Sequence, residues 1–438
     1  MSDVRQPQNP PEETFRPIHG ENTLLWTVWF TYGAFYFCRT NISAAVPGLK
    51  DSVEAGGLGL SHTQVSYFLV GFKIAYAAGQ LLNGQFSEQL APRKLLAIGM
   101  IGTALLNVLF GFGAGLYFLI FIWACNGYSQ SLGWTPCVRV LANWFPVLRR
   151  GKVIGFVGTG YQATAVATYL VSGYAADWFG WRAALWVPAG IMLFAAVIML
   201  LFLEEQPKLS ESPGVDDGDM KQVVTGPRND PRNSVWENLV LTISNPALWL
   251  LGISLGLLNA CRYGFLDWGL THLKEVQETG VGKAALKYAV LPVGAIAGSY
   301  VAGWATDRFF NSRRAPVTCI LLVSLALLSL AYDWTARTSV PATMVLLVMI
   351  GFCIYGPQVL LVGTAPADLA KRGTSAAAAG FVNCMGYIGA ASGDYFTART
   401  LDASGWERAI FLWAAWALGA AVAAGLLWNA TASHNEPD

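Results

Sequence analysis

The stretch LLAIGMIGTALLNVLFGFGAGLYFLIFIWACNGYSQSLGWTPCV, residues Leu95–Val138, contains no Asp, Glu, Lys, Arg or His. Further stretches without these residues cover 153–176, 183–203, 288–306 and 338–367. A helix needs about 20 apolar residues to cross the hydrocarbon core, and backbone groups in lipid must pair within their own segment. These stretches therefore predict transmembrane helices. The composition agrees, because only 13% of the residues are charged, whereas soluble domains have about 25%.

The uncharged stretches predict an all-α membrane protein with twelve transmembrane helices. We expect the spans at 23–48, 62–87, 94–115, 117–143, 152–176, 183–204, 243–272, 284–307, 315–333, 341–366, 374–398 and 406–429. Basic clusters such as Arg149-Arg150 and Lys371-Arg372 recur in alternate short loops. The positive-inside rule therefore predicts that these loops and both termini are cytoplasmic. The uncharged stretches make the lipid bilayer the expected partner. The net charge of +1 gives no general attraction to nucleic acid.

A polar segment divides the predicted spans into two sets of six. It contains acidic residues together with Ser, Pro and Gly, which is typical of a flexible linker. We expect the following division of the chain: a cytoplasmic tail at 1–22, a six-helix bundle at 23–204, a cytoplasmic linker at 205–242, a second six-helix bundle at 243–430 and a tail at 431–438.

Two short patterns recur at equivalent places in the two halves. A Gly-x-x-x-acid pattern follows the second span at 84–88 and the eighth at 303–307. A Gly-Trp pair precedes the sixth span at Gly180 and the twelfth at Gly405. The offsets of 219 and 225 residues are similar. The patterns therefore predict two pseudo-symmetric bundles related by duplication in parallel orientation, an arrangement known in transporters.

The repeated acidic pattern predicts residues that stabilise one conformation. Glu88 and Asp307 would lie at cytoplasmic helix ends beside basic loops, where each carboxylate can pair with an arginine or a helix N-terminus. The glycine of each pattern would allow close helix approach. Arg139, near the cytoplasmic end of the fourth span, is expected to have a structural or gating role, with Glu88 as a possible partner.

Two arginines within the membrane are the strongest functional signal, because charge there is costly and usually functional. Arg39 lies in the first span and Arg262 in the seventh, 223 residues apart, in line with the repeat. We expect them to face each other near the midplane and to bind a dianion through their guanidinium groups. Phosphate fits best and carboxylate second. The alternative is local pairing, for which Asp267 is a candidate beside Arg262. Asn259, in the same predicted span, is a further candidate substrate ligand.

The second span adds a polar face formed by Lys73, Tyr76 and Gln80 at helical spacing. Lys73 is expected to be an anion ligand, a charge partner or a lysine that extends to the membrane interface. Asp394, in the eleventh span, is expected to pair with a cation, to lie near the outer surface or to carry a coupled proton.

Aromatic side chains accompany the two arginines along five predicted spans. These candidates are Tyr32, Tyr36, Tyr76, Trp134, Tyr355 and Tyr387. Tyrosine hydroxyls at midplane depth need polar partners, which an anionic organic ligand would supply. We found no nucleophile–base pair, phosphate loop or metal-ligand spacing, so the sequence predicts neither an enzyme nor a metal or cofactor site.

Four segments resemble the organophosphate:phosphate antiporters of the major facilitator superfamily. They are Tyr36-Phe-Cys-Arg39-Thr-Asn, Gly133-Trp-Thr-Pro-Cys-Val-Arg139, Arg262-Tyr-Gly-Phe-Leu-Asp-Trp268 and Ile354-Tyr-Gly-Pro357. The resemblance covers the chain from about Trp26 to Trp428. It implies the major facilitator fold, phosphoryl binding by Arg39 and Arg262, and a site bordered by the six aromatic residues.

The sequence departs from the glycerol-phosphate pattern of that family at four positions. Thr40, Gln80 and Tyr161 replace two cations and a histidine, and Pro292 replaces an acid. Gln162 lies beside Tyr161 and is a further candidate ligand. The first three changes fall where the resemblance implies that substrate selectivity is set, so the organic part of the substrate is left open.

Together with these residues, the resemblance implies a monomeric carrier in a bacterial inner membrane that exchanges an organophosphate for inorganic phosphate by alternating access. One alternative is a proton- or sodium-coupled symporter of a carboxylate or phosphonate, which would need a titratable carboxylate such as Asp267 or Asp394. Another is a transporter-like sensor of sugar phosphate.

Overall fold

The computed structural model describes residues 20–145, 147–206, 240–311, 313–370 and 375–430. Helices and their connections make up these ranges, and the described residues include no strand. The predicted linker at 205–242 and both predicted tails lie largely outside them.

The chain forms two sets of helices. The N-terminal half contains α1 Glu21–Phe37, α2 Ile42–Lys50, the short 3₁₀ turn η1 Val53–Ala55, α3 His62–Gln89, α4 Pro92–Phe112, α5 Leu116–Gln130, α6 Trp134–Trp144, α7 Val147–Phe179 and α8 Ala183–Phe202. The C-terminal half contains α11 Pro246–Tyr263, the π-helical segment η3 Gly264–Trp268, α12 Gly269–Val276, α13 Val281–Tyr288, α14 Leu291–Phe309, α15 Arg314–Thr338, α16 Val340–Val359, the π-helical segment η4 Leu360–Thr364, α17 Ala365–Leu369 and α18 Ser375–Gly425.

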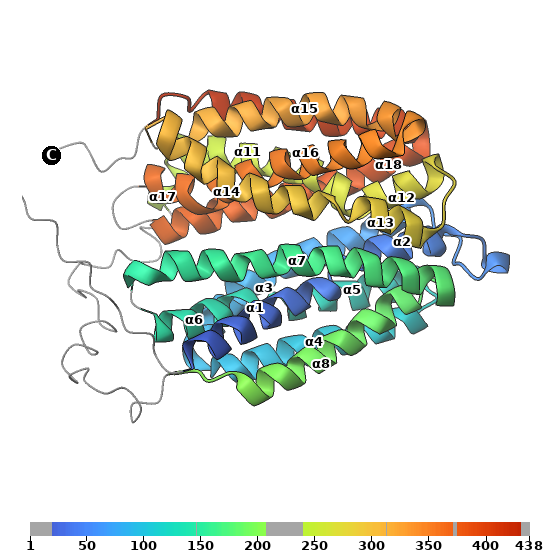
Figure 1. Cartoon of the computed structure of the whole chain (residues 1–438), viewed down its shortest axis with the longest axis horizontal. Helices are drawn as coiled ribbons and strands as arrows, with labels where there is room; N and C mark the ends of the chain where they lie inside the picture. The colour runs from blue at the N-terminus through green and yellow to red at the C-terminus, as the bar shows by residue number, and fades with distance from the viewer. Residues whose placement is uncertain (1–19, 146, 207–239, 312, 371–374, 431–438) are drawn as a thin grey trace, which may run out of the picture.

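The two halves lie side by side with their long helices running in the same general direction (Figure 1). They approach each other where α2, α12 and α13 lie, opposite the end that carries α6 and α17. The expectation of twelve spans in two bundles is confirmed, although α18 contains two of them. Its two helices meet at Gly405, where φ is 76°.

Several spans are interrupted rather than continuous. The predicted first span is divided into α1 and α2 by a break at residues 38–41. The seventh passes through a π-helical segment, and the fourth is divided between α5 and α6. Seven of the described helical stretches are long and apolar enough to cross a membrane by length and composition. Interruptions are tolerated at membrane depth where protein groups satisfy the freed backbone.

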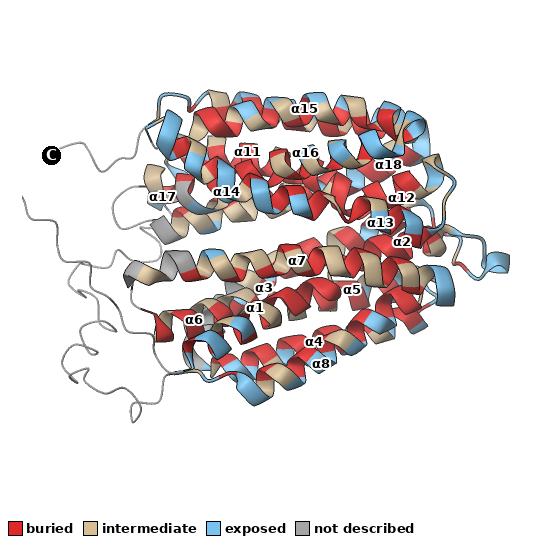
Figure 2. Ribbon diagram, in the orientation of Figure 1, coloured by how far each residue is buried: buried red, intermediate tan, exposed pale blue. Residues whose placement is uncertain are grey.

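The outer faces of both halves are apolar. Large side chains such as Leu105, Phe194, Leu327 and Phe411 are exposed on them. Figure 2 shows the exposed positions on outward faces and the buried positions along the faces between helices. Soluble monomers seldom expose contiguous apolar surface on this scale, so these faces are suited to contact with lipid.

Glycines fix the closest helix contacts and the repeated turns. A Cβ at Gly389 of α18 would lie 2.0 Å from the backbone oxygen of Gly256 in α11, so only glycine permits this approach. Gly180 and Gly405 both have positive φ, 82° and 76°. Each Gly-Trp pair thus places a glycine with positive φ between two helical segments. The predicted packing role of Gly303 is wrong, because a Cβ there would meet open space.

Candidate functional site

The break between α1 and α2 positions Arg39. Residues 38–41 leave the helix, which frees the carbonyl of Cys38 from its usual partner. Side-chain amides of Asn107, Asn126 and Gln130 donate to this carbonyl over 3.4, 3.3 and 2.7 Å. Because the freed backbone group is satisfied inside the protein, the break is stable at membrane depth.

Gln130 also holds the arginine itself. The Arg39 Nε donates to Gln130 Oε1 over 2.7 Å, and the guanidinium group lies over the rings of Tyr36 and Tyr76 at 4.8 and 4.5 Å. The charge is therefore held by an amide and two aromatic faces, each a neutral partner. None of the described acids forms an ion pair with Arg39.

The equivalent region of the C-terminal half is the π-helical segment η3. Its widened turn exposes carbonyls, and tyrosine hydroxyls satisfy two of them. Tyr288 donates to the carbonyl of Phe265, and Tyr169, from the other half, donates to that of Leu266 over 3.4 Å. Single π-helical turns are frequent at functional sites. Here the turn lies directly after Arg262 and contains Asp267.

Arg262 is buried and turns toward aromatic groups. Its terminal nitrogen donates to the Tyr355 hydroxyl over 3.3 Å, and the guanidinium group lies 4.9 Å from the ring centroids of Tyr263 and Tyr355. The Nε is buried and has no hydrogen-bond partner within the described chain. The expected alternative, pairing with Asp267, is wrong because that carboxylate pairs elsewhere.

Both arginines line one cavity between the halves. Its wall is formed by Tyr36, Arg39, Thr40, Ile42, Leu69, Phe72, Lys73, Trp123, Ala165, Arg262, Tyr263, Leu266, Asp267, Pro292 and Tyr355. The Tyr36 hydroxyl on this wall accepts from a terminal nitrogen of Arg39 over 3.5 Å. Arg39 and Arg262, which occupy equivalent positions in the two halves, therefore lie on the wall of the same cavity.

Lys73 is a buried charge partner rather than an interfacial lysine. Only 2% of the residue is exposed. Its Nζ donates to Asp267 Oδ2 over 2.6 Å and also contacts Asp394 Oδ2, while the Tyr263 ring centroid lies 4.1 Å away. The lysine comes from the N-terminal half and both acids from the C-terminal half. Of the expectations for Asp394, pairing with a cation is the one observed.

Most of the predicted aromatic residues form one cluster around the arginines. Tyr36 and Tyr161 stack with centroids 4.8 Å apart, and Tyr32 lies 4.6 Å from Trp134. A second contact joins the halves, because Tyr76 of α3 lies 5.0 Å from Tyr387 of α18. Tyr355 contacts Arg262 through its hydroxyl.

Three predicted polar ligands have protein partners. Gln162 donates to the Tyr161 hydroxyl over 3.2 Å and to Ser299 of the other half over 3.4 Å. Gln80 donates to the carbonyl of Ser131 over 3.5 Å. Asn259 donates to the carbonyl of Gly386 over 3.1 Å, which fixes α11 against α18. Asn259 is therefore placed at a helix–helix contact rather than on the cavity wall.

The predicted gating residues have mixed outcomes. Asp307 pairs with Arg314 over 3.0 Å, in agreement with the expected acid–arginine contact. Arg139 donates to the carbonyl of Leu90 over 2.9 Å. The side chain of Glu88 lies outside the described residues, so its pairing with Arg139 stays a prediction.

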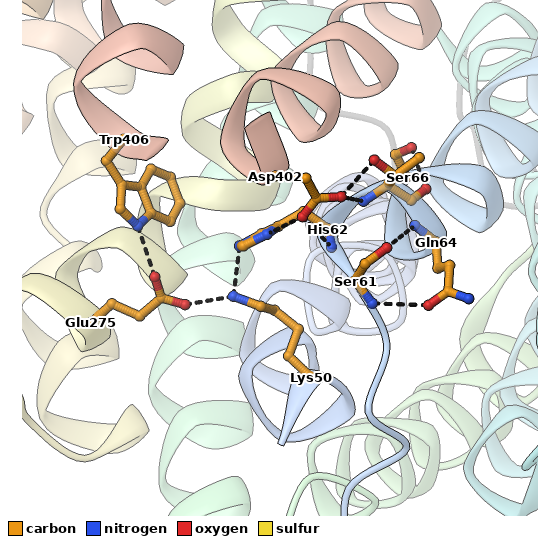
Figure 3. Close-up of polar contacts among 9 residues, drawn as sticks. Lys50, Ser61, His62, Gln64, Ser66, Glu275, Asp402 and Trp406 are labelled. Atoms are coloured by element: carbon orange, nitrogen blue, oxygen red, sulfur yellow. Dashed lines mark hydrogen bonds and ion pairs between the residues drawn. The ribbon is translucent and has the colours of Figure 1, made fainter. Parts of the chain in front are cut away.

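A polar network joins the halves at what we call the closed end, which comprises the loop 51–61, α12, α13 and the connection 399–405. Figure 3 shows its centre, where Lys50 Nζ contacts both Glu275 and His62, each over 2.6 Å. The His62 Nδ1 lies 2.8 Å from Asp402, and Glu275 accepts from Trp406 over 2.7 Å.

Asp402 caps a helix of the opposite half. Its carboxylate accepts from the backbone N–H groups of His62 and Thr63, over 3.1 and 2.8 Å, and from the Thr63 hydroxyl over 2.6 Å. Asp402 lies in the connection between the last two spans. Partial burial alone would raise the pKa of this carboxyl, but the bonds from Thr63 and His62 outweigh burial and lower the pKa to about 2.

A second helix cap joins the two halves at the same end. Asp177 of α7 accepts from the backbone N–H of Gly282 in the first turn of α13 over 2.8 Å.

The sequence did not predict the network at the closed end, and it did not predict the role of Gln130. The only available signal for Gln130 was an amide within the uncharged stretch Leu95–Val138.

Comparisons with known proteins identify the family of the chain. Residues 28–394 match the Major Facilitator Superfamily. The membrane sensor protein UhpC of Escherichia coli (strain K12) is 28% identical, with 88% of this chain and 87% of that protein covered. The probable hexose phosphate transport protein of Chlamydia muridarum is 26% identical, covering 93% and 91%. The glycerol-3-phosphate transporter of Bacillus subtilis (strain 168) is 26% identical, covering 92% and 91%.

The fold also matches solved structures. A bacterial homologue of the human lysosomal transporter Spinster, in an inward-facing and unoccupied conformation, aligns with a TM-score of 0.73 at 15% identity, covering 93% of this chain and 96% of that one. These matches confirm the resemblance and the expectation of an integral membrane transport protein rather than an enzyme. The match over residues 28–394 includes both arginines and most of both helical sets, and the chain therefore belongs to the Major Facilitator Superfamily.

Proposed function

We propose that this protein carries an organophosphate across the membrane in exchange for inorganic phosphate, with the phosphoryl group held between Arg39 and Arg262. The observation that carries this proposal is the charge balance of the cavity. Lys73 is paired with two acids, whereas neither arginine pairs with a described acid. Two guanidinium groups with neutral neighbours suit a dianion, because each can form two parallel bonds to phosphate oxygens.

Relatives with phosphorylated cargo support the substrate class. The similar proteins include transporters named for hexose phosphate and for glycerol 3-phosphate. The organic part of the substrate would contact Tyr32, Trp134 and Tyr161, where aromatic faces and hydroxyls offer both stacking and hydrogen bonds. Thr40 and Pro292 on the cavity wall carry no charge. Selectivity would therefore depend on shape and hydroxyl contacts more than on further charges.

The distribution of contacts between the halves supports alternating access. Exchange requires that the closed end opens and that the opposite end closes around the same site. A bound dianion neutralises the arginine pair and lowers the cost of burying it during this change. The empty site would have to bury two uncompensated guanidinium groups, which is costly. Slow return of the empty carrier is what makes transport an obligatory exchange.

The positively charged loops suggest which side of the membrane the closed end faces. By the positive-inside rule, basic pairs such as Arg149-Arg150 would lie on the cytoplasmic side. The closed end would then face outward, and both termini would be cytoplasmic in a bacterial inner membrane. The similar solved structure is itself inward-facing. One copy of the chain contains the whole site, so a monomer would suffice.

A second function is sensing, which the similarity to a membrane sensor protein favours. A sensor would bind the same ligand in the same cavity without moving it. The test is counterflow of labelled hexose 6-phosphate and glycerol 3-phosphate into phosphate-loaded proteoliposomes. Transport that requires internal phosphate supports exchange, and binding without transport supports sensing. Uptake that ignores internal phosphate and collapses with a proton ionophore would overturn the exchange proposal.

A further inference from the structure

Lys73, Asp267 and Asp394 form a buried cluster with unequal charge. The lysine side chain is 3% exposed, the Asp394 side chain 0% and the Asp267 side chain 12%. One ammonium group contacts both carboxylates. The Asp394 Oδ1 is also buried without a hydrogen-bond partner in the described chain. If both acids were ionised, the cluster would carry one uncompensated negative charge away from water, which is strongly unfavourable.

Within the part of the chain that the structure describes, no second cation forms an ion pair with either carboxylate. On α11, Tyr263 presents its ring to Lys73, and Arg262 turns to Tyr355. Tyr169 of α7 and Tyr288 of α13 lie against the π-helical segment that contains Asp267, and their hydroxyls donate to backbone carbonyls of that segment. A pair of carboxyl groups that shares one site in this way relieves the excess charge by holding a proton between them.

We propose that Asp267 and Asp394 together bind one proton and that this proton is taken up with a dianionic phosphate ester. This inference rests on the proposed function and extends it. With one proton on the pair, the Lys73 cluster is neutral, and a dianion neutralises Arg39 and Arg262. Without the proton, the loaded cavity carries one net negative charge. Proton and dianion therefore favour each other's binding, and by linkage the effect is reciprocal.

The geometry gives the proton a route. Asp267 lines the cavity, and its side chain is the most exposed of the three in the cluster, at 12%. A hydronium ion in cavity water would transfer its proton to Asp267. One O–H bond breaks on the hydronium ion, one forms on the carboxyl group, a water molecule remains, and the proton is then shared with Asp394. Lys73 belongs to the other half, so protonation also weakens an ion pair between the halves. Protonation therefore brings the net charge of the loaded cavity to zero and also makes it easier for the two halves to move relative to each other.

The linkage is tested by calorimetric binding of glycerol 3-phosphate in buffers of different ionisation enthalpy between pH 7.5 and 9. The ester is dianionic there, because its second pKa is about 6. We expect uptake of up to one proton per ligand and a dissociation constant that rises toward tenfold per pH unit as the pair titrates. Asp394→Asn should bind ligand with no proton uptake and a flat pH profile. Glu54→Gln, which removes an exposed carboxylate, should behave as wild type.

Infrared difference spectroscopy separates this inference from the proposed function. A pH titration of the unliganded protein should reveal one protonated carboxylic acid band that Asp394→Asn and Asp267→Asn each remove. The band is measurable even if glycerol 3-phosphate does not bind, and Asp267→Asn serves if Asp394→Asn does not fold. Absence of the band in wild type, or proton uptake that persists in Asp394→Asn, would overturn the proton site.

Discussion

Asp402 offers a direct way to perturb the balance between the two ends of the molecule. Its carboxylate caps α3 across the boundary between the halves, through two backbone N–H groups and the Thr63 hydroxyl. We expect Asp402→Ala to shift the conformational population toward molecules in which the closed end has opened. An N-cap of this kind contributes about 1–2 kcal/mol. The equilibrium should therefore move by about 5- to 30-fold, since 1.4 kcal/mol corresponds to a factor of ten.

A graded series distinguishes capping from nonspecific damage. Asparagine is nearly as good an N-cap as aspartate, so Asp402→Asn should keep most of the cap. It should weaken the contact with His62 and lose the interaction of the charge with the helix dipole, about 0.3–1 kcal/mol. Its shift should be about two- to fivefold. Glu407→Gln, which changes an exposed acid in the helix that follows Gly405, is the control and should leave the equilibrium unchanged.

Pulsed electron paramagnetic resonance measures this population. Spin labels on unnatural amino acids at Val53 and Ser404, two exposed positions on opposite halves, avoid the seven native cysteines. The long-distance fraction should grow in the order wild type, Asp402→Asn, Asp402→Ala. Because bonding lowers the pKa of Asp402 to about 2, the cap is complete above its ordinary pKa and is lost as pH falls toward 2. An unchanged distance distribution in Asp402→Ala would refute the capping role.

Three further changes probe the site and its support. Gln130→Leu removes the amide that holds Arg39. Because hydrogen bonds to charged groups contribute about 1.5–3 kcal/mol, the affinity for phosphate measured by calorimetry should fall by about tenfold or more. An unaltered affinity would contradict the role of Gln130. Lys73→Met leaves two buried acids unpaired and should destabilise the protein by about 3–5 kcal/mol, measured as a lower melting temperature that an added Asp394→Asn partly restores. Tyr288→Phe frees a buried carbonyl and should cost about 1–3 kcal/mol, whereas Tyr300→Phe, on an exposed side chain, should have no measurable effect on thermal unfolding.

Much of the architecture could be predicted because membrane helices have a strong local signal. Uncharged stretches locate the spans, and the repeated Gly-Trp pair identifies turns that both require positive φ at Gly180 and Gly405. The repeat also pairs Arg39 with Arg262, and the structure brings both to one cavity wall. These inferences depend on spacing and on the cost of charge in lipid, which the sequence contains directly.

The remaining contacts depend on tertiary geometry. No spacing rule indicates that Lys73 meets Asp267 and Asp394, because these residues are separated by 194 and 321 positions. The break at 38–41 and the π-helical turn at 264–268 were also missed. Both persist because side chains from other helices satisfy the freed carbonyls, and a single helix sequence does not indicate such partners.

The central claim is that one arginine from each half binds the same phosphoryl group. Solid-state NMR can test it by dipolar recoupling between the phosphorus of bound glycerol 3-phosphate and ¹³C-labelled arginine Cζ atoms. The account predicts two arginines in contact with phosphorus, one lost in Arg39→Lys and the other in Arg262→Lys, with both retained in the control Arg182→Lys. Contact with no arginine, or a contact pattern unaffected by either site substitution, would contradict it.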